Sequence, residues 1–427
     1  MQTAPPKLDK PAFFRDLGYR PHAGQLEIHT STAPRRVVAC GVRWGKTLAA
    51  AMEALAAAMQ PRDRSVGWVV APTYDLCDRV FRELLILVYE HFAHRIITVK
   101  EHEKKIVLRN LGGGVSEIRG KSAENPTSLL GEGLDWVIID EASRLRPTIW
   151  EGHISQRLID KKGWALLIST PKGKGWFFDL YLRGQPGAGG ETRDPDYRSW
   201  NNPSWTNPHL DAALIEAERA RLPERVFAQE YGGEFVEGAG QVFRKVREAA
   251  TGEWKEPAPG KEYYAGLDLA KTEDYTVLVI LNADREVVFV DRFHRIDWMF
   301  QINRVSAALA RYRHAPVHVD STGKGEPVHE LLCEAGCNAW QYGFTNRSKA
   351  AIVDNLSILL ERGMITLPKP TLWPEGIDEL EAYQYSVTDL GTTRTSAPSG
   401  MHDDCVIALA LAAWHLPPGD ANAWGCS

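Results

Sequence analysis

Residues 40–47 combine the residue types of a loop that binds phosphate groups. They read Cys-Gly-Val-Arg-Trp-Gly-Lys-Thr and lie between a β-rich run and an alanine-rich stretch typical of a helix. Such a loop turns successive backbone N–H groups toward phosphate oxygens at the N-terminus of the helix. Lys46 would neutralise the β- and γ-phosphates, and the hydroxyl of Thr47 would bind Mg²⁺. We therefore expect this stretch to bind a nucleoside triphosphate through Gly41, Arg43, Gly45, Lys46 and Thr47.

A second segment supports this interpretation, because the loop alone is not specific: Cys40 stands where the usual pattern has its first glycine. Residues 134–142 read Leu-Asp-Trp-Val-Ile-Ile-Asp-Glu-Ala, a buried-strand run that ends in two carboxylates and is typical of a Walker B segment. Asp140, 94 residues after Lys46 (140 − 46), would hold Mg²⁺ directly or through water. Glu141 would orient and deprotonate the attacking water. Together the two segments predict a site that hydrolyses a nucleotide.

Three shorter pieces stand where such a site would use them. Gln25 precedes the first β-rich run, and its amide would read the edge of an adenine. Residues 69–74 end another run in a turn that would line a track for DNA. Ser169 and Thr170 end a third run, where their hydroxyls would lie near the γ-phosphate and sense hydrolysis. None of these pieces is specific by itself.

Aspartates end three apolar runs in the C-terminal part of the chain. Asp268 and Asp320 each end a strand-like run, and Asp403 and Asp404 open the last helix-like stretch. Burying a charged carboxylate in an apolar surrounding costs free energy unless a cation binds it. A pair of divalent metal ions would neutralise all of these aspartates at once. Two hard cations about 4 Å apart would clamp the attacking and leaving oxygens of a phosphodiester displacement. The order strand, strand, helix predicts an RNase H-like nuclease that uses Mg²⁺ or Mn²⁺, and Asp274 would reach the same cluster.

Two polar residues near this cluster are expected to have other roles. His402 is expected at the start of the helix, beside the metal ligands and not among them. Lys349 would either contact a DNA phosphate or lie on a solvated helix start.

The elements expected around these residues form two domains of different kinds. Up to about residue 200 short β-rich runs alternate with helical stretches, which predicts a parallel sheet covered by helices. The expected strands are residues 35–40, 66–71, 105–109, 115–119, 136–139 and 165–169. Later, runs at 263–269, 275–281 and 286–293 follow one another too closely for intervening helices, which predicts an antiparallel meander. Further elements of this mixed α/β domain are a strand at 317–320 and helices at 301–312, 348–362 and 402–415.

The boundaries follow from a stretch that loses periodicity and gathers glycine, proline and charge. It predicts a linker at residues 233–260. We therefore expect a first domain at 1–232, a second at 261–418 and a tail at 419–427.

Composition excludes several classes of protein. The chain has 427 residues, 44% hydrophobic and 25% charged, which fits a soluble globular protein of two or three domains. Its longest apolar run, at residues 406–414, is shorter than the ~20 residues that span a bilayer. No apolar secretory segment opens the sequence, and the six scattered cysteines fit a reducing cytoplasm. A net charge of −5 leaves nucleic acid open as a partner, through local basic clusters.

A nucleotide hydrolase followed by an RNase H-like nuclease resembles the large terminase subunits of tailed bacteriophages. The resemblance covers nearly the whole chain and is carried by residues 41–47, 69–74, 138–142, 169–171, 266–270, 319–321 and 402–404. It implies a P-loop ATPase domain of the RecA/ASCE type, followed by an RNase H-like nuclease domain of the RuvC type. In such proteins the ATPase drives double-stranded DNA into a procapsid, and the nuclease cuts the concatemer by two-metal-ion chemistry.

The resemblance also implies roles and partners. Lys46 and Thr47 would bind ATP with Mg²⁺, and Glu141 would be the catalytic base. Ser169 and Thr170 would couple hydrolysis to movement, whereas Asp268, Asp320 and Asp403 or Asp404 would bind the nuclease metals. Expected partners are double-stranded DNA, a portal protein and a small terminase subunit. The protein would be a monomer in solution and a ring on the procapsid, in the host cytoplasm and at the portal vertex during packaging, with no membrane.

One position departs from the family pattern. Family members commonly carry an arginine before a glycine upstream of the Walker B segment, whereas residues 128–131 read Ser-Leu-Leu-Gly here. An arginine finger is worth about 10³ to 10⁵ in turnover. The candidates for this role are Arg43 in the same subunit, or Arg119, Arg144, Arg146 and Arg157 across a ring interface.

Two other functions stay open on the sequence. A two-lobed helicase shares the phosphate loop and the acidic pair, but it needs a second ATPase lobe, and no arginine-rich motif after residue 255 supplies one. A nucleotide-gated DNA-binding or assembly protein without nuclease activity would keep the same sequence features.

Overall fold

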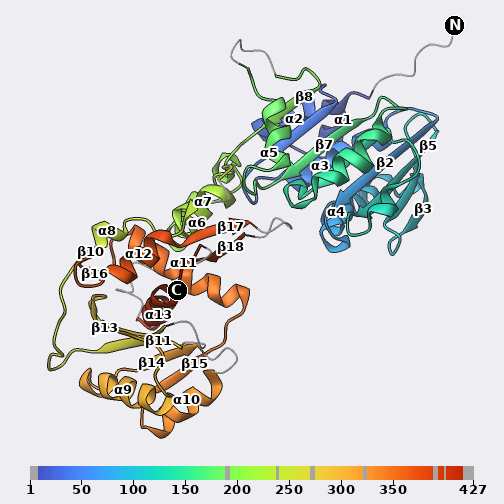
Figure 1. Ribbon diagram of the computed structural model, residues 1–427. Helices are drawn as coiled ribbons and strands as arrows, with labels where there is room; N and C mark the ends of the chain where they lie inside the picture. Colours follow the sequence, from blue (N-terminus) through green and yellow to red (C-terminus); the bar gives the residue numbers. More distant parts are fainter. Residues whose placement is uncertain are drawn as a thin grey trace. The chain divides into compact units, whose positions relative to one another are not determined.

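The computed structural model describes residues 8–187, 193–236, 240–269, 275–320, 325–387, 393–398 and 401–416. The chain forms two compact units (Figure 1). Unit 1 comprises Met1–Glu216 and Arg225–Glu237, and unit 2 comprises Ala217–Glu224 and Gly238–Ser427. None of the described helices is long and apolar enough to cross a membrane.

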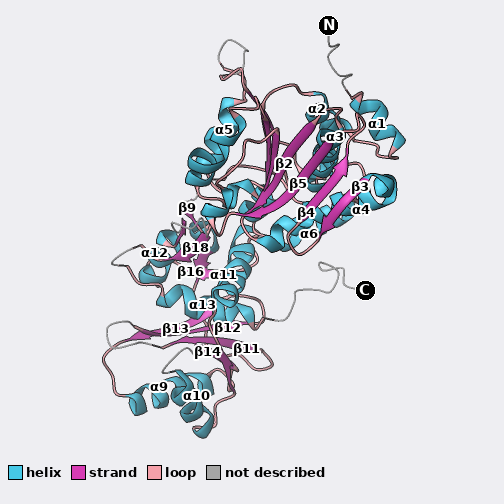
Figure 2. Ribbon diagram, turned by 90° about the vertical axis from the view of Figure 1, so that its right-hand side faces the viewer, coloured by secondary structure: helices cyan, strands magenta, loops and turns pink. Residues whose placement is uncertain are grey.

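Unit 1 is built on an eight-stranded sheet with the strand order β3-β4-β5-β2-β6-β7-β1-β8. Figure 2 labels the part of the sheet from β3 to β2. Neighbouring strands are parallel from β5 to β8, whereas β4 is antiparallel to both of its neighbours. The strands are β1 Arg35–Ala39, β2 Arg64–Ala71, β3 Ile96–Lys100, β4 Lys105–Arg109, β5 Val115–Ser122, β6 Trp136–Asp140, β7 Trp164–Ser169 and β8 Tyr197–Trp200. All six predicted strands are present, and the sequence analysis missed only the two edge strands, β3 and β8.

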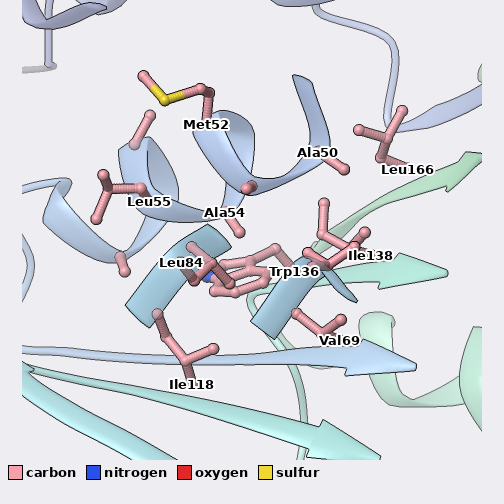
Figure 3. Packing of buried hydrophobic residues seen from close by; sticks show 14 of the residues in the cluster. Ala50, Met52, Ala54, Leu55, Val69, Leu84, Ile118, Trp136, Ile138 and Leu166 are labelled. Carbon is pink, nitrogen blue, oxygen red and sulfur yellow. The ribbon is translucent and has the colours of Figure 1, made fainter. Parts of the chain in front are cut away.

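Helices cover both faces of this sheet. On one face α3 and α4 pack against Trp136, Val69 and Ile138, with the indole of Trp136 at the centre of the cluster (Figure 3), and α1 and α2 pack on α3. The close fit depends on Gly67, where a Cβ atom would lie 1.9 Å from the Trp136 ring. On the other face lie α5 and the short helices of residues 142–158. The helices of unit 1 are α1 Lys10–Asp16, α2 Ala23–Thr30, α3 Lys46–Met59, α4 Tyr74–Phe92 and α5 Trp176–Arg183, with short helical turns at Ala93–Arg95, Pro126–Leu129, Ala142–Arg144, Ile149–Ile154, Ser155–Leu158 and Ser204–Thr206. The sequence bounds between the units fall within α6 Ala212–Arg221 and α7 Glu224–Glu230.

The strand register brings three predicted motifs to one edge of the sheet. Strands β6, β7 and β1 are adjacent and parallel, so their carboxyl ends meet at the same edge. Ala39 pairs with Ser169, and Asp140 pairs with Ile168. The phosphate loop, the acidic pair and the two hydroxyl residues therefore leave the sheet side by side.

Unit 2 contains a five-stranded sheet with the order β13-β12-β11-β14-β15 (Figure 2). The predicted meander is confirmed, because β11, β12 and β13 pair antiparallel; β11, β14 and β15 pair in parallel. These strands are β11 Tyr263–Asp268, β12 Thr276–Asn282, β13 Val287–Phe293, β14 Val317–Asp320 and β15 Ala339–Tyr342. The helices are α8 Val246–Ala249, α9 Trp298–Arg311, α10 Gly325–Glu334, α11 Asn346–Glu361, α12 Pro374–Ala382 and α13 Asp404–Trp414. Two small sheets complete the unit, from β9 Gly240–Gln241, β10 Ala250–Gly252, β16 Leu367–Pro368, β17 Gln384–Val387 and β18 Thr393–Ser396.

The predicted linker at residues 233–260 is wrong over much of its length. Residues 240–252 form β9, α8 and β10, and they belong to the core of unit 2. Phe243 is fully buried and stacks on Tyr383 with ring centroids 5.5 Å apart. The glycines and prolines that indicated a linker flank this short folded segment, and too few apolar residues lie within it to give a periodic pattern.

Helix α13 lies directly on the sheet of unit 2 because β11 carries a glycine at the contact. A Cβ atom on Gly266 would lie 2.1 Å from the carbonyl oxygen of Ala408 and 2.4 Å from the amide nitrogen of Ala412. Ten of the helix residues, Asp404–Ala413, are buried. The contact fixes the start of α13 over the end of β11.

We expect Gly266→Ala to destabilise unit 2 by about 3 kcal/mol, because overpacking against backbone atoms forces the helix away from the strand. Thermal unfolding followed by circular dichroism measures the loss. The matched control is Gly240→Ala, where an added Cβ atom meets nothing within 4 Å. An unfolding temperature for Gly266→Ala equal to that of the control would contradict the close packing.

Candidate active sites

The phosphate loop of unit 1 runs from the end of β1 to the start of α3. Arg43 and Gly45 have positive φ angles, 58° and 102°, which turn the chain so that α3 begins at Lys46. The Lys46 ammonium lies inside the loop, where it donates to the carbonyl oxygens of Cys40 and Gly41, both at 2.7 Å. It also lies 3.3 Å from the hydroxyl of Thr170. Burial lowers the pKa of Lys46, and the nearby Cys40, Glu141 and Asp140 oppose that shift.

Residues far along the chain hold this loop in place. The carbonyl oxygens of Asn202 and Glu230 accept hydrogen bonds from the first two N–H groups after Cys40, at 3.0 and 2.7 Å. The side chains of Ser204 and Asn207 donate to two loop carbonyl oxygens, at 2.6 and 2.9 Å. These residues were not predicted from the sequence. The two Asn-Pro dipeptides at 202–203 and 207–208 are typical of turns and could have indicated that the chain turns there.

Gln25, predicted to read an adenine, also contacts this loop. Its amide nitrogen donates to the carbonyl oxygen of Gly45 at 3.0 Å, and its amide oxygen accepts from the N–H of His22 at 3.2 Å. The side chain is buried. Because both ends of the amide are bound within the chain, the structure places Gln25 among the residues that support the phosphate loop.

Two carboxylates follow β6 at the edge beside the loop. Asp140 is buried, and burial followed by the charge of Glu141 raises its pKa to about 6. Its Oδ1 accepts the N–H of Glu141 at 2.9 Å, whereas Oδ2 is buried and accepts no hydrogen bond among the described residues. Glu141 has a φ angle of 49°, a strained value for a residue with a side chain, which turns it away from the strand direction. The pair therefore presents carboxylate oxygens to the space beside Lys46.

The hydroxyl residues after β7 are tied to the acidic segment. Ser143 lies 2.7 Å from the hydroxyl of Ser169 and donates to the carbonyl oxygen of Thr170 at 2.9 Å. Since Thr170 also lies beside Lys46, the ends of β6 and β7 and the phosphate loop form one network. Ser143 was not predicted, because a serine two residues after an acidic pair carries no sequence signal of its own.

Two arginines face Glu141. Arg79 of α4 lies 3.7 Å from Oε1, and Arg144 lies 3.5 Å from Oε2. Arg144 was among the candidates for the finger, whereas Arg79 was missed because only the fold brings α4 to the end of β6. The other candidates differ: Arg119 pairs with Glu117, Arg157 donates to the carbonyl oxygen of Gly131, and Arg43 and Arg146 are exposed.

The carboxylates of unit 2 meet at one edge of its sheet. Asp268 ends β11 and Asp320 ends β14, two adjacent parallel strands, and Asp403 and Asp404 stand at the start of α13. Burial raises the pKa of Asp268 well above its usual value, and the charges of Asp404, Asp320 and Asp403 raise it further. The charges of three predicted site residues thus act on the fourth, Asp268. Asp274 lies outside the described residues.

Neighbouring groups orient the two aspartates of α13. Asp404 Oδ2 accepts the N–H of Tyr275 at 3.1 Å, and His402 Nδ1 lies 3.7 Å from the same oxygen. Lys349 lies 3.0 Å from Asp403 Oδ2. Within the described ranges, no three acidic, histidine or cysteine side chains already stand close enough to hold one metal ion. A bound cation would therefore draw the carboxylates together, against the mutual repulsion of their charges.

Comparisons with known proteins assign the family. Residues 38–249 match the family described as terminase large subunit, T4likevirus-type, N-terminal, and residues 265–416 match the terminase RNaseH-like domain. The chain is 33% identical over 432 residues to the large terminase subunit of Thermus virus P23-45, covering 94% of this chain and 88% of that one. The chain belongs to the terminase large subunit family. A solved large terminase from a thermophilic bacteriophage has the same fold, with a TM-score of 0.53 at 14% identity, over 93% of this chain and 99% of that one.

Membership of the terminase family confirms the predicted fold class and the predicted function. The chain combines a P-loop ATPase fold with an RNase H-like nuclease fold, and it is an enzyme with ATPase and DNA-cleaving activity. It acts in the packaging of viral DNA. A helicase or an assembly protein without nuclease activity finds no support in these relatives.

Proposed function

We propose that ATP is hydrolysed in unit 1 by the network around Lys46 and that DNA is cut in unit 2 by the aspartates around Asp268. The observation that carries the proposal is the meeting of predicted groups at one edge of each sheet. In unit 1 these are the phosphate loop, Asp140 with Glu141, and Ser169 with Thr170. In unit 2 the electrostatic effect of three aspartates on Asp268 supports the cluster.

In unit 1 the residues fit a triphosphate with Mg²⁺. Lys46 lies within a loop that turns toward a helix N-terminus, the arrangement that binds phosphate oxygens. Asp140 Oδ2 is a buried acceptor that lacks a donor among the described groups, which fits a water ligand of a cation, and Thr47 follows Lys46 in α3. Bound Mg²⁺ would neutralise charge on the phosphates. Glu141 would take the proton of the attacking water, and Arg79 and Arg144 would hold its carboxylate in place.

Ser169 and Thr170 would report hydrolysis to the rest of unit 1. Thr170 contacts Lys46, and Ser169 contacts Ser143 in the segment that carries the base. Loss of the γ-phosphate frees the Lys46 ammonium, so a change at one phosphate reaches both strand ends. This coupling is the proposed link between hydrolysis and movement of DNA.

In unit 2 the donor set fits hard divalent cations, because carboxylate oxygens are the ligands that Mg²⁺ and Mn²⁺ prefer. Two such ions would activate the attacking water and stabilise the leaving oxygen. Asp268, Asp320, Asp403 and Asp404 would hold them, and Asp274 is a further candidate. The metal that acts in the cell would be Mg²⁺, with Mn²⁺ as a substitute.

We also propose partners and a place of action. Double-stranded DNA would bind through its phosphates with little base preference, so affinity would fall steeply with salt. A portal protein and a small terminase subunit would dock the protein on the procapsid as a ring, in the cytoplasm of a bacterial host. Site selection on the DNA would belong to the small subunit.

One experiment tests both proposed activities, ATP hydrolysis and DNA cleavage. The purified full chain is incubated with a circular plasmid, with and without ATP, and cleavage of the plasmid is measured. We expect cleavage to require Mg²⁺ or Mn²⁺ and to stop on addition of EDTA. ATP hydrolysis, measured in the same tube, should also need the metal. Cleavage that persists in EDTA would contradict the metal-dependent mechanism.

A further inference from the structure

Lys349 stands beside the carboxylate cluster at a place that its own helix disfavours. It is the fourth residue of α11, which begins at Asn346 after the capping Thr345. This end of a helix carries the positive pole of the helix dipole, which destabilises a cation. The Lys349 ammonium lies 3.0 Å from Asp403 Oδ2, with 32% and 31% of the two side chains exposed. The neighbouring carboxylates, and not the helix, explain the position of this lysine.

The two adjacent aspartates are held by different kinds of partner. Asp404 Oδ2 accepts the backbone N–H of Tyr275, a neutral donor that orients a carboxylate and leaves its charge in place. Asp403 is paired with a full positive charge. A metal ion that binds Oδ2 of Asp403 must displace the ammonium from that oxygen, and a metal ion at either carboxylate oxygen is repelled by the positive charge a few ångströms away. Asp404 Oδ2 has Nδ1 of His402 at 3.7 Å, beyond hydrogen-bond distance, whereas at Asp403 the ammonium of Lys349 lies within that distance.

We propose that Lys349 withholds Asp403 from the metals. On this account Asp268, Asp320 and Asp404 bind a first ion, and Asp403 completes a second, weaker site only when Lys349 moves away. Lys349 is thus a positioning residue that sets the affinity of the second ion. The inference rests on the proposed function, since it presupposes that the aspartates bind the nuclease metals.

The test is Mn²⁺ binding to the full chain without nucleotide, followed by the electron paramagnetic resonance signal of free Mn²⁺. Binding that persists in Asp268→Asn is subtracted, which removes any contribution from unit 1. The native chain should bind one ion tightly and a second weakly. Lys349→Met keeps the apolar stem and removes the charge, so its second ion should bind on the order of tenfold more tightly. Lys349→Arg keeps the charge and should bind like the native chain.

The possible outcomes separate this inference from the proposed function. Equal or weaker binding of the second ion by Lys349→Met overturns the role of Lys349, provided that Asp404→Asn still abolishes tight binding. If neither Asp404→Asn nor Asp268→Asn changes Mn²⁺ binding, the metal site itself is wrong. Thermal unfolding of each variant shows whether it is folded, and tenfold tighter binding by Lys349→Arg would also contradict the role of the charge.

Discussion

Glu141→Gln is expected to lower the kcat of ATP hydrolysis by about 10² to 10⁴, because a general base contributes that factor and glutamine cannot accept the proton. The shape of the side chain is kept, so nucleotide binding should be unchanged. Arg79 and Arg144, which lie 3.7 and 3.5 Å from the carboxylate, would lose their ionic partner but not their place. Steady-state phosphate release measures turnover, and equilibrium binding of a fluorescent ATP analogue measures affinity.

The control for this variant is Glu151→Gln, an exposed glutamate on the same segment of unit 1. Its turnover should match that of the native chain. Plasmid cleavage by Glu141→Gln in the absence of ATP should also be native, because the base lies in the other unit. Turnover above a tenth of the native value would show that another group is the base.

Asp268→Asn is expected to abolish metal-dependent plasmid cleavage, with a loss of at least about a hundredfold, since even outer partners of metal ligands cost 10- to 100-fold. ATP hydrolysis should be unaffected. We expect the variant to stay folded, because burial and three acidic neighbours raise the pKa of Asp268 well above its usual value. A carboxyl group with a raised pKa destabilises the fold where it is ionised, so asparagine should keep or increase the thermal stability at neutral pH.

Asp284→Asn is the matched control, because Asp284 is an exposed residue of the same unit that pairs with Lys261. It should cleave plasmid at the native rate. Native cleavage by Asp268→Asn would exclude this aspartate from the metal site, and a parallel loss of ATPase activity would contradict the independence of the two sites.

The parts of each site that lie on strand ends could be predicted from the sequence. Lys46, Asp140 and Ser169 each follow a β-rich run, and adjacent parallel strands bring such residues together by geometry alone. In unit 2, Asp268 and Asp320 likewise end two adjacent parallel strands. A short motif next to an apolar run is therefore sufficient to predict that these residues lie together at the edge of the sheet.

Residues that act through the backbone could not be predicted. Asn202 and Glu230 hold the phosphate loop by carbonyl oxygens, which every residue type possesses, so their identity carries no signal. Gln25 was found, but its contact with the phosphate loop was not predicted, because the sequence does not show that Gly45 offers it an acceptor. The folded segment at 240–252 was missed since its few apolar residues, such as Phe243, are buried by chain that follows much later.

The central claim is that the aspartates of unit 2 form a metal site distinct from the ATPase. Crystals of the full chain soaked in Mn²⁺ and measured near the manganese absorption edge test it directly. We predict an anomalous peak bounded by the carboxylates of Asp268, Asp320 and Asp404, present without any nucleotide. Diffraction of the same quality with no peak among these residues would contradict the claim.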